Sequence, residues 1–209
     1  MNKKKIIMII IILILVIAFI FLCNLGRKVY ILSKYSEKTE EYSKLTNFYK
    51  KMHNDSGITT EFWRKDDLGF LKMTSNDFVR MIYWGKDYNW IVVDDKDGKT
   101  AVKMVKEDYG FGAQTLTTGT LYMENMWDKI KMAFSSKITT EKLNNINCYK
   151  FSHNKDWQMF INKDSFLVMR EINGSTDTGF IEYRLNEVRD EDVLMPNLAG
   201  YTINDTTQK

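Results

Sequence analysis

Histidine and cysteine are the side chains that most often carry catalysis or bind a transition metal, and this sequence has few of either. His53 and His153 are the only histidines, and neither has a second ligand three or four residues away in a spacing typical of zinc sites. Cys148 alternates with Ile146 in a predicted strand, which favours a small core residue. No Ser–His–acid or Cys–His order stands out, although such triads assemble in space rather than in sequence. We predict no catalytic residue, no metal site and no enzymatic activity.

Two short motifs resemble ligand-binding loops but lack the required register. The run 94–98 (Asp-Asp-Lys-Asp-Gly) is rich in acids, yet with Gly98 at the sixth position of a calcium loop the first and twelfth positions are Val93 and Met104. A hairpin turn is the better interpretation. Gly110-Phe111-Gly112 is followed by no lysine and no helix start at the spacing of a phosphate loop. We therefore expect no cofactor.

The unusual chemistry of this chain is apolar and bulky. It contains 12 Met, 12 Phe, 11 Tyr and 5 Trp, and many of them fall on predicted strands. Methionine is flexible and adapts to irregular partners, and ligand pockets are largely apolar, so a concave sheet lined in this way could hold an acyl chain. The alternative is that the same side chains pack against the predicted helices. The candidate ligand-binding residues are Met73, Met81, Tyr83, Trp90, Met104, Trp157, Met159 and Met169.

The cellular location of the protein is indicated by Ile6–Cys23, a segment that is entirely apolar and follows Lys3–Lys5. At ~1.5 Å per residue such a helix crosses most of a hydrocarbon core ~30 Å thick. It is long for a cleaved secretory signal, and no small residue lies in Phe19–Leu22 to mark a cleavage site. A lipoprotein signal is disfavoured because Leu22 precedes Cys23. We predict an uncleaved, single-pass anchor in the cell membrane.

The orientation follows from the flanking charges. Lys3–Lys5 lie tight against the apolar run with no acid nearby, which favours a cytoplasmic N-terminus and an extracytoplasmic domain. Arg27, Lys28 and Lys34 on the far side weaken this asymmetry. The expected organisation is a cytoplasmic stub and anchor at 1–28, a domain at 29–203 and a polar tail at 204–209.

Charge and cysteine content limit the possible partners. Formal net charge is +3, but five bases and no acid precede Tyr30, which leaves 25 bases against 27 acids in the rest of the chain. Nucleic acid is excluded because it would require a basic face on the folded domain. Cys148 is the one cysteine beyond the anchor, so a disulfide within the domain is impossible.

Periodicity predicts the elements of the domain. Apolar residues at spacings of three and four predict an amphipathic helix over 29–53, stopped at Gly57. A second helix is predicted over 121–134, after a glycine-containing loop at 107–120 that is long enough to act as a lid. Strands, with period two, are expected at 58–64, 69–74, 78–84, 88–94, 100–106, 147–153, 157–162, 166–172 and 180–185.

The short polar breaks between these strands predict antiparallel hairpins, because parallel strands need a long crossover. Nine strands in one sheet would split, flatten or curl. The predicted fold is α+β: an N-terminal transmembrane helix, then a curved antiparallel sheet that forms an incomplete β-barrel, with helices packed on its concave side.

The C-terminal third also resembles a known family. The segments that carry the likeness are 146–151, 160–170, 181–183, 190–193 and 196–201. Their order is similar to that of the LolA-like family of lipoprotein carriers and the related outer-membrane lipoprotein-sorting proteins, here in a clostridial-type, membrane-anchored form. The likeness extends over roughly residues 35–201.

The resemblance implies an incomplete barrel with a helical lid and an apolar cavity for lipid chains. This chain departs from the carriers because they are free to shuttle, whereas it is expected to be tethered. The expected function is binding of a lipid or lipoprotein acyl chain by an extracytoplasmic domain. The alternative is a protein-interaction or sensor module of the cell envelope that binds an envelope protein and no lipid.

Overall fold

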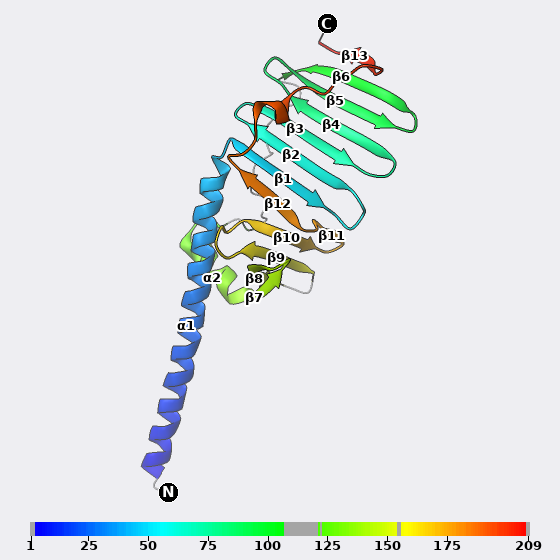
Figure 1. Ribbon diagram of the computed structural model, residues 1–209. Helices are drawn as coiled ribbons and strands as arrows, with labels where there is room; N and C mark the ends of the chain where they lie inside the picture. Colours follow the sequence, from blue (N-terminus) through cyan, green and yellow to red (C-terminus); the bar gives the residue numbers. More distant parts are fainter. Residues whose placement is uncertain (1–2, 107–120, 122, 154–155, 208–209) are drawn as a thin grey trace.

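The computed structural model describes residues 3–106, 121, 123–153 and 156–207. One long helix projects from a β-rich domain made of two sheets (Figure 1). The predicted loop at 107–120 lies outside the described residues, so its role as a lid stays a prediction. The described parts confirm an α+β chain with an N-terminal apolar helix and large antiparallel sheets that do not close into a barrel.

Helix α1 (Lys3–Ser43) joins the apolar run to the amphipathic segment without a break. Its side chains from Lys4 to Asn24 are exposed, and burial begins further along, at Ile31, Leu32 and Tyr35. The exposed part is long and apolar enough to cross a membrane. The N-terminal part of the helix is therefore apolar and exposed, whereas its C-terminal part packs against the domain.

The predicted extension of this helix to His53 is wrong. The helix ends at Ser43, and Asn47–His53 forms strand β1, which pairs with strands on both of its sides. Tyr49 and Met52 fit a helical spacing by coincidence, whereas the buried neighbours Phe48 and Tyr49 point to opposite faces of the sheet. This segment forms a strand because it pairs with β12 on one side and β2 on the other. No local sequence pattern indicates that pairing.

The larger sheet has eight strands. Five of them form a run of hairpins, β2 (Thr59–Lys65), β3 (Leu68–Thr74), β4 (Phe78–Trp84), β5 (Tyr88–Asp95) and β6 (Gly98–Val105). β12 (Ile181–Leu185) pairs with β1 at one edge, and β13 (Thr202–Asp205) adds in parallel to β6 at the other. The order is β12-β1-β2-β3-β4-β5-β6-β13. The hairpins confirm the predicted ones to within two residues at each end.

The smaller sheet has five strands in the order β11-β10-β9-β8-β7. They are β7 (Lys137–Leu143), β8 (Ile146–Ser152), β9 (Trp157–Asn162), β10 (Val168–Asn173) and β11 (Thr176–Asp177). β10 contacts β12, so the two sheets meet at this pair of strands. β7, β11 and β13 had no counterpart among the predicted strands.

Helix α2 (Met126–Ser135) begins five residues later than predicted. Asn125 caps it, accepting a hydrogen bond at Oδ1 from the backbone N–H of Asp128 at 3.1 Å, and such a cap fixes where a helix starts. α1 and α2 pack together on the smaller sheet around Phe151, Met159 and Ile161. A second cluster joins Phe48, Phe62, Leu71, Ile82 and Trp84 of the larger sheet to Cys148, Phe160, Leu167 and Met169.

The segment 186–201, which we call the strap, connects β12 at one edge of the larger sheet to β13 at the other. It contains the 3-10 turn η2 (Asp190–Val193). Val188 and Val193 of the strap pack on Tyr49 and Trp63, and at its end the Tyr201 hydroxyl lies 3.5 Å from Asp94 Oδ2. The strap therefore crosses one face of the sheet, which we call the strap face. The opposite face carries Phe48, Phe62 and Leu71 and is called the core face.

Candidate functional site

The strand register divides the eight predicted ligand-binding residues among different surfaces. Met73 and Met104 lie on the core face, whereas Met81, Tyr83 and Trp90 lie on the strap face. Directly paired residues share a face and neighbours in sequence do not, so the pairing of Tyr83 with Trp90 and of Met104 with Asn89 fixes this assignment. One cavity cannot be lined by both groups.

The three remaining candidates belong to the smaller sheet. Met159 is fully buried beneath the two helices, and Trp157 packs against the same cluster. Trp157 Nε1 donates a hydrogen bond to Glu171 Oε1 at 3.1 Å. Both residues therefore fit the alternative of core packing. Met169 differs, because it lines a groove at the surface.

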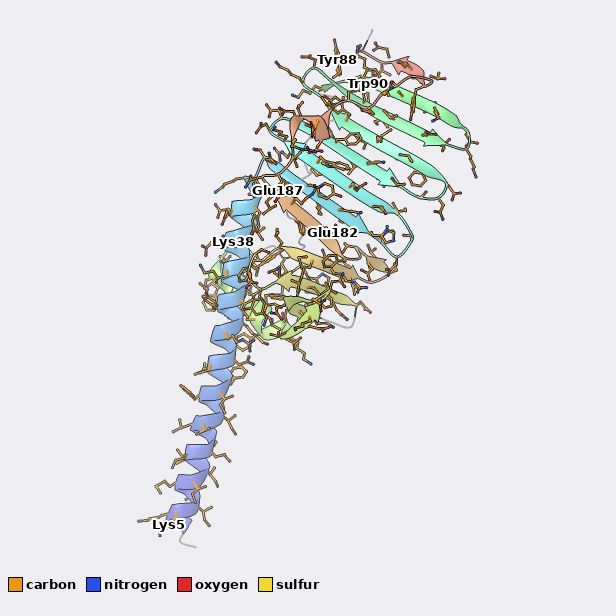
Figure 2. The ribbon with its side chains drawn as sticks, viewed as in Figure 1. Lys5, Lys38, Tyr88, Trp90, Glu182 and Glu187 are labelled. Atoms are coloured by element: carbon orange, nitrogen blue, oxygen red, sulfur yellow. The ribbon has the colours of Figure 1, made fainter. Side chains whose placement is uncertain are left out.

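This inter-sheet groove has a volume of about 390 Å³ and lies where the smaller sheet meets β12. Glu182, labelled in Figure 2, marks its β12 side. Leu167 and Met169 are almost buried and connect it to the hydrophobic core. Its volume is within the range of small-molecule sites. The lining residues are Ile146, Asn162, Ser165, Leu167, Met169, Phe180, Glu182 and Tyr183.

A tight turn between β9 and β10 builds one wall of the groove. Asn162 Oδ1 accepts hydrogen bonds from the backbone N–H groups of Asp164 (2.8 Å) and Ser165 (3.1 Å). Phe166 adopts a positive φ of 60°, which is strained for an aromatic residue. From outside the turn, the Tyr42 hydroxyl of α1 donates to the Ser165 carbonyl at 2.7 Å. These bonds hold the wall in place and connect it to α1.

The β12 side of the groove is fixed in a similar way. The Tyr183 hydroxyl donates to the carbonyl of Val168 at 2.7 Å, which ties β12 to the start of β10. The register of β10 against β9 shifts between Val168 and Arg170, so Met169 is the extra residue of an irregularity. Such irregularities redirect a side chain. The chemistry this arrangement offers is apolar contact beside the polar groups of Asn162, Ser165 and Glu182.

A buried charged pair lies beside the same junction. Lys50 of β1 is 5% exposed and Glu171 of β10 is 8% exposed. Burial lowers the pKa of Lys50 to about 8, and the nearby Glu171 carboxylate partly offsets that effect. A buried lysine of this kind can be functional, but buried ion pairs also serve structure alone. Neither residue lines the inter-sheet groove, so we assign the pair to the packing where the two sheets meet.

The strap face carries a row of aromatic side chains. Each pairs directly with the next across neighbouring strands, and ring centroids lie 5.1 Å apart for Tyr49–Trp63 and 5.5 Å apart for Trp63–Phe70. The Arg184 guanidinium lies 4.1 Å from the centre of the Tyr49 ring at one end. Figure 2 shows Trp90 on β5, far from α1. The row consists of Tyr49, Trp63, Phe70, Tyr83 and Trp90.

A second hollow of about 470 Å³, lined largely by charged side chains, lies at the tips of the β3–β4 and β5–β6 hairpins. Among its lining residues, Asp95 pairs with Gly98 across a two-residue turn, and Asp95 Oδ1 accepts from the backbone N–H of Asp97 at 2.9 Å. This is the predicted hairpin turn. Within the described ranges, no group of three or more histidine, cysteine or acidic side chains is placed to hold a metal ion.

The site features that were not predicted are only partly visible in the sequence. Trp63 and Phe70 are visible as aromatics on predicted strands, but their alignment in a row requires the register. The groove residues Ile146, Leu167 and Phe180 are ordinary apolar residues in the sequence. Cys148 is buried as predicted, and burial raises the pKa of its thiol.

Comparison with known proteins adds no assignment. No family model matches the sequence, and no curated protein matches it. Among solved structures, two crystal forms of PNGF-II share 10% sequence identity with the chain, at TM-scores of 0.29 and 0.26. Each match covers 76% of this chain, which spans about 31% and 30% of the length of those proteins. The LolA-like resemblance therefore stays a prediction.

Proposed function

We propose that this protein is a single-pass membrane protein whose extracytoplasmic domain binds a lipid or lipoprotein acyl chain in the inter-sheet groove. The observation that carries the proposal is the groove itself, a hollow of about 390 Å³ in which Met169 and other apolar side chains lie beside the polar residues Asn162, Ser165 and Glu182. The same class of ligand is what the LolA-like resemblance of residues 35–201 implies.

The chemistry of the groove supports an unbranched apolar ligand. Ile146, Leu167, Met169 and Phe180 offer hydrocarbon and thioether surface, and Met adapts to ligands of different shape. Transfer of an acyl chain from water to such a surface is favourable by about 0.8 kcal/mol per methylene. Glu182 and the polar groups at the rim would limit the site to the chain and leave the head group in water.

The apolar helix supports membrane attachment. Its exposed run begins beside Lys5, at the end of α1 away from the domain (Figure 2). The lysines at 3–5 favour a cytoplasmic N-terminus. A tethered domain would present its groove to chains at one membrane and would not carry them between two membranes.

Photo-crosslinking of the full chain in lipid nanodiscs tests the groove. A diazirine-bearing fatty acid is added, irradiated and located by peptide mass spectrometry. The expected products map to 162–169 and 180–183, in addition to the apolar helix. Labelling confined to the apolar helix would overturn the assignment of the groove.

A matched pair of variants sharpens the test. Ile146→Trp fills the groove from β8 and is expected to remove the domain labelling. Ile138→Trp places the same bulk on β7 at a half-buried isoleucine outside the groove and is expected to leave the labelling unchanged. Equal labelling of both variants would show that the fatty acid reacts elsewhere.

A protein-interaction module is the second candidate, and one observation favours it. Among the described residues, β7 pairs on one side alone, with β8, so it is an edge strand of the smaller sheet. Open edges accept an added strand from a partner. Crosslinking in native membranes that recovers one stoichiometric envelope protein and no lipid would select this function over the first.

A further inference from the structure

Helix α2 leaves large apolar side chains in solvent. Met126 is 55% exposed, Trp127 71% and Phe134 58%. Elsewhere on the helix, Ala133 is fully buried and Met132 packs on the core shared with α1. Exposed side chains of this size on a short helix indicate a contact that the isolated chain does not satisfy.

The position of α2 along α1 is fixed by three contacts. The rings of Phe21 and Phe134 have centroids 5.9 Å apart. Lys28 Nζ donates hydrogen bonds to the carbonyls of Ala133 (3.0 Å) and Ser136 (2.7 Å), at the C-terminal end of α2. A cation at this end is favoured both by the free carbonyls and by the helix dipole.

These contacts set the level of α2 relative to a bilayer. A span of about 20 residues beginning at Ile6 ends near Leu25. Phe21 then lies about 6 Å inside that boundary and Lys28 about 4 to 5 Å outside it, at 1.5 Å per residue. The C-terminal end of α2 touches both residues and therefore lies at the boundary between hydrocarbon and head groups.

We propose that α2 is an interfacial helix whose exposed face, formed by Met126, Trp127 and Phe134, enters the surface of the same bilayer that α1 crosses. This inference rests on the proposed membrane attachment and goes beyond the proposed ligand. Tryptophan is enriched at this depth of membrane proteins, because its ring is apolar and its N–H remains near water. Interfacial helices bury one apolar face in this way.

The charges around α2 agree with a lipid surface as the occupant. Lys129 and Lys131 lie on the helix, Lys137 follows it, and Arg27 and Lys28 lie on the adjoining turn of α1. Asp128 is the single acid of α2. Lysine and arginine next to an anionic membrane are each worth about 1 kcal/mol of attraction, so the excess of bases favours a surface of anionic lipid.

Two attachment points would fix the domain against the membrane. α1 alone permits the domain to rotate about the helix axis, whereas a second contact through Trp127 selects one face. Because α1 and α2 both pack on the smaller sheet, that sheet, with the β8–β9 side of the inter-sheet groove, would be held near the bilayer.

Spin-label accessibility in nanodiscs of phosphatidylcholine and phosphatidylglycerol tests the inference on the full chain. In a Cys23→Ser background, with Cys148 buried, single cysteines are introduced as Trp127→Cys and Met126→Cys for labelling. The control is Ile203→Cys, since Ile203 is also an apolar residue that is 55% exposed but lies on β13. Leu15→Cys reports on the span itself.

The expected result is a shift of collision accessibility toward oxygen and away from a water-soluble nickel chelate at positions 127 and 126, relative to position 203. Labels at 127 and 126 that match position 203 while position 15 is lipid-exposed would overturn the interfacial helix and leave the anchor intact. Protection from both reagents would overturn it in favour of contact with a second copy. A water-exposed label at position 15 would refute the membrane attachment and the interfacial helix together.

Discussion

Replacement of Lys50 by methionine removes a buried positive charge with little change in volume. Burial lowers the pKa of Lys50 from 10.5 to about 8, although Glu171 acts in the opposite direction. At about 1.4 kcal/mol per unit, this shift corresponds to a cost on the order of 3 kcal/mol for keeping the lysine charged in the folded state.

The sign of the pH dependence follows from the same values. Between pH 8 and 10.5 the unfolded chain holds the lysine proton and the folded chain releases it, so stability rises with pH across this window. Below pH 8 both states are charged and the full cost is present. The wild-type chain should therefore gain up to about 3 kcal/mol relative to Lys50→Met between pH 8 and 10.5.

Denaturant unfolding of the full chain in detergent micelles, at intervals from pH 7 to 10.5, measures this difference. Lys72→Met is the matched control, because Lys72 lies half-buried on the strap face of the same sheet. Its stability should run parallel to that of the wild type. A constant difference between wild type and Lys50→Met across the window would refute the depressed pKa and the reasoning from burial.

Three further predictions concern the backbone and the packing. Gly179→Ala should prevent native folding, because a Cβ there would lie 1.7 Å from the His53 carbonyl oxygen, whereas Gly57→Ala, with open space at its positive φ, should cost about 1–2 kcal/mol in a thermal melt. Val193→Ala should cost about 2 kcal/mol and speed proteolysis within the strap, because Val193 is 1% exposed; unchanged cleavage would contradict the packing of the strap. Asn125→Ala should cost about 1 kcal/mol, measured by denaturant unfolding, because it removes the cap of α2, and Asn125→Asp should restore most of that stability.

Local pattern predicted most of the larger sheet. The hairpins from β2 to β6 have period-two alternation and short polar turns, and each of these signals acts within a few residues. The helix predicted over Asn47–His53 is wrong because long-range pairing, and not local pattern, decides the structure of this segment. Its pairing partners are β2 and the distant β12, and the paired residues of β1 and β12 are 129 to 137 positions apart in the sequence.

For the candidate site too, the residue types could be predicted from the sequence, but their positions relative to one another could not. The sequence indicated that methionine and aromatic side chains are the candidate ligand-binding residues. One of them, Met169, does line the inter-sheet groove. It could not separate Met73 from Met81, because the face of each depends on the cross-strand register. It also could not place Phe180 beside Ile146, because Ile146 lies in the smaller sheet and Phe180 directly precedes β12 of the larger one.

By itself, the sequence determined the apolar helix, the hairpins, the lack of a disulfide within the domain and the residue types available to a ligand. These properties depend on composition and short-range periodicity, which the chain carries whatever its tertiary contacts. The tertiary structure alone decided which aromatics form a row, where the groove opens and that α2 meets α1 beside Phe21 and Lys28. Each of these depends on contacts between segments far apart in sequence, and the free energy of such contacts is not encoded in any one segment.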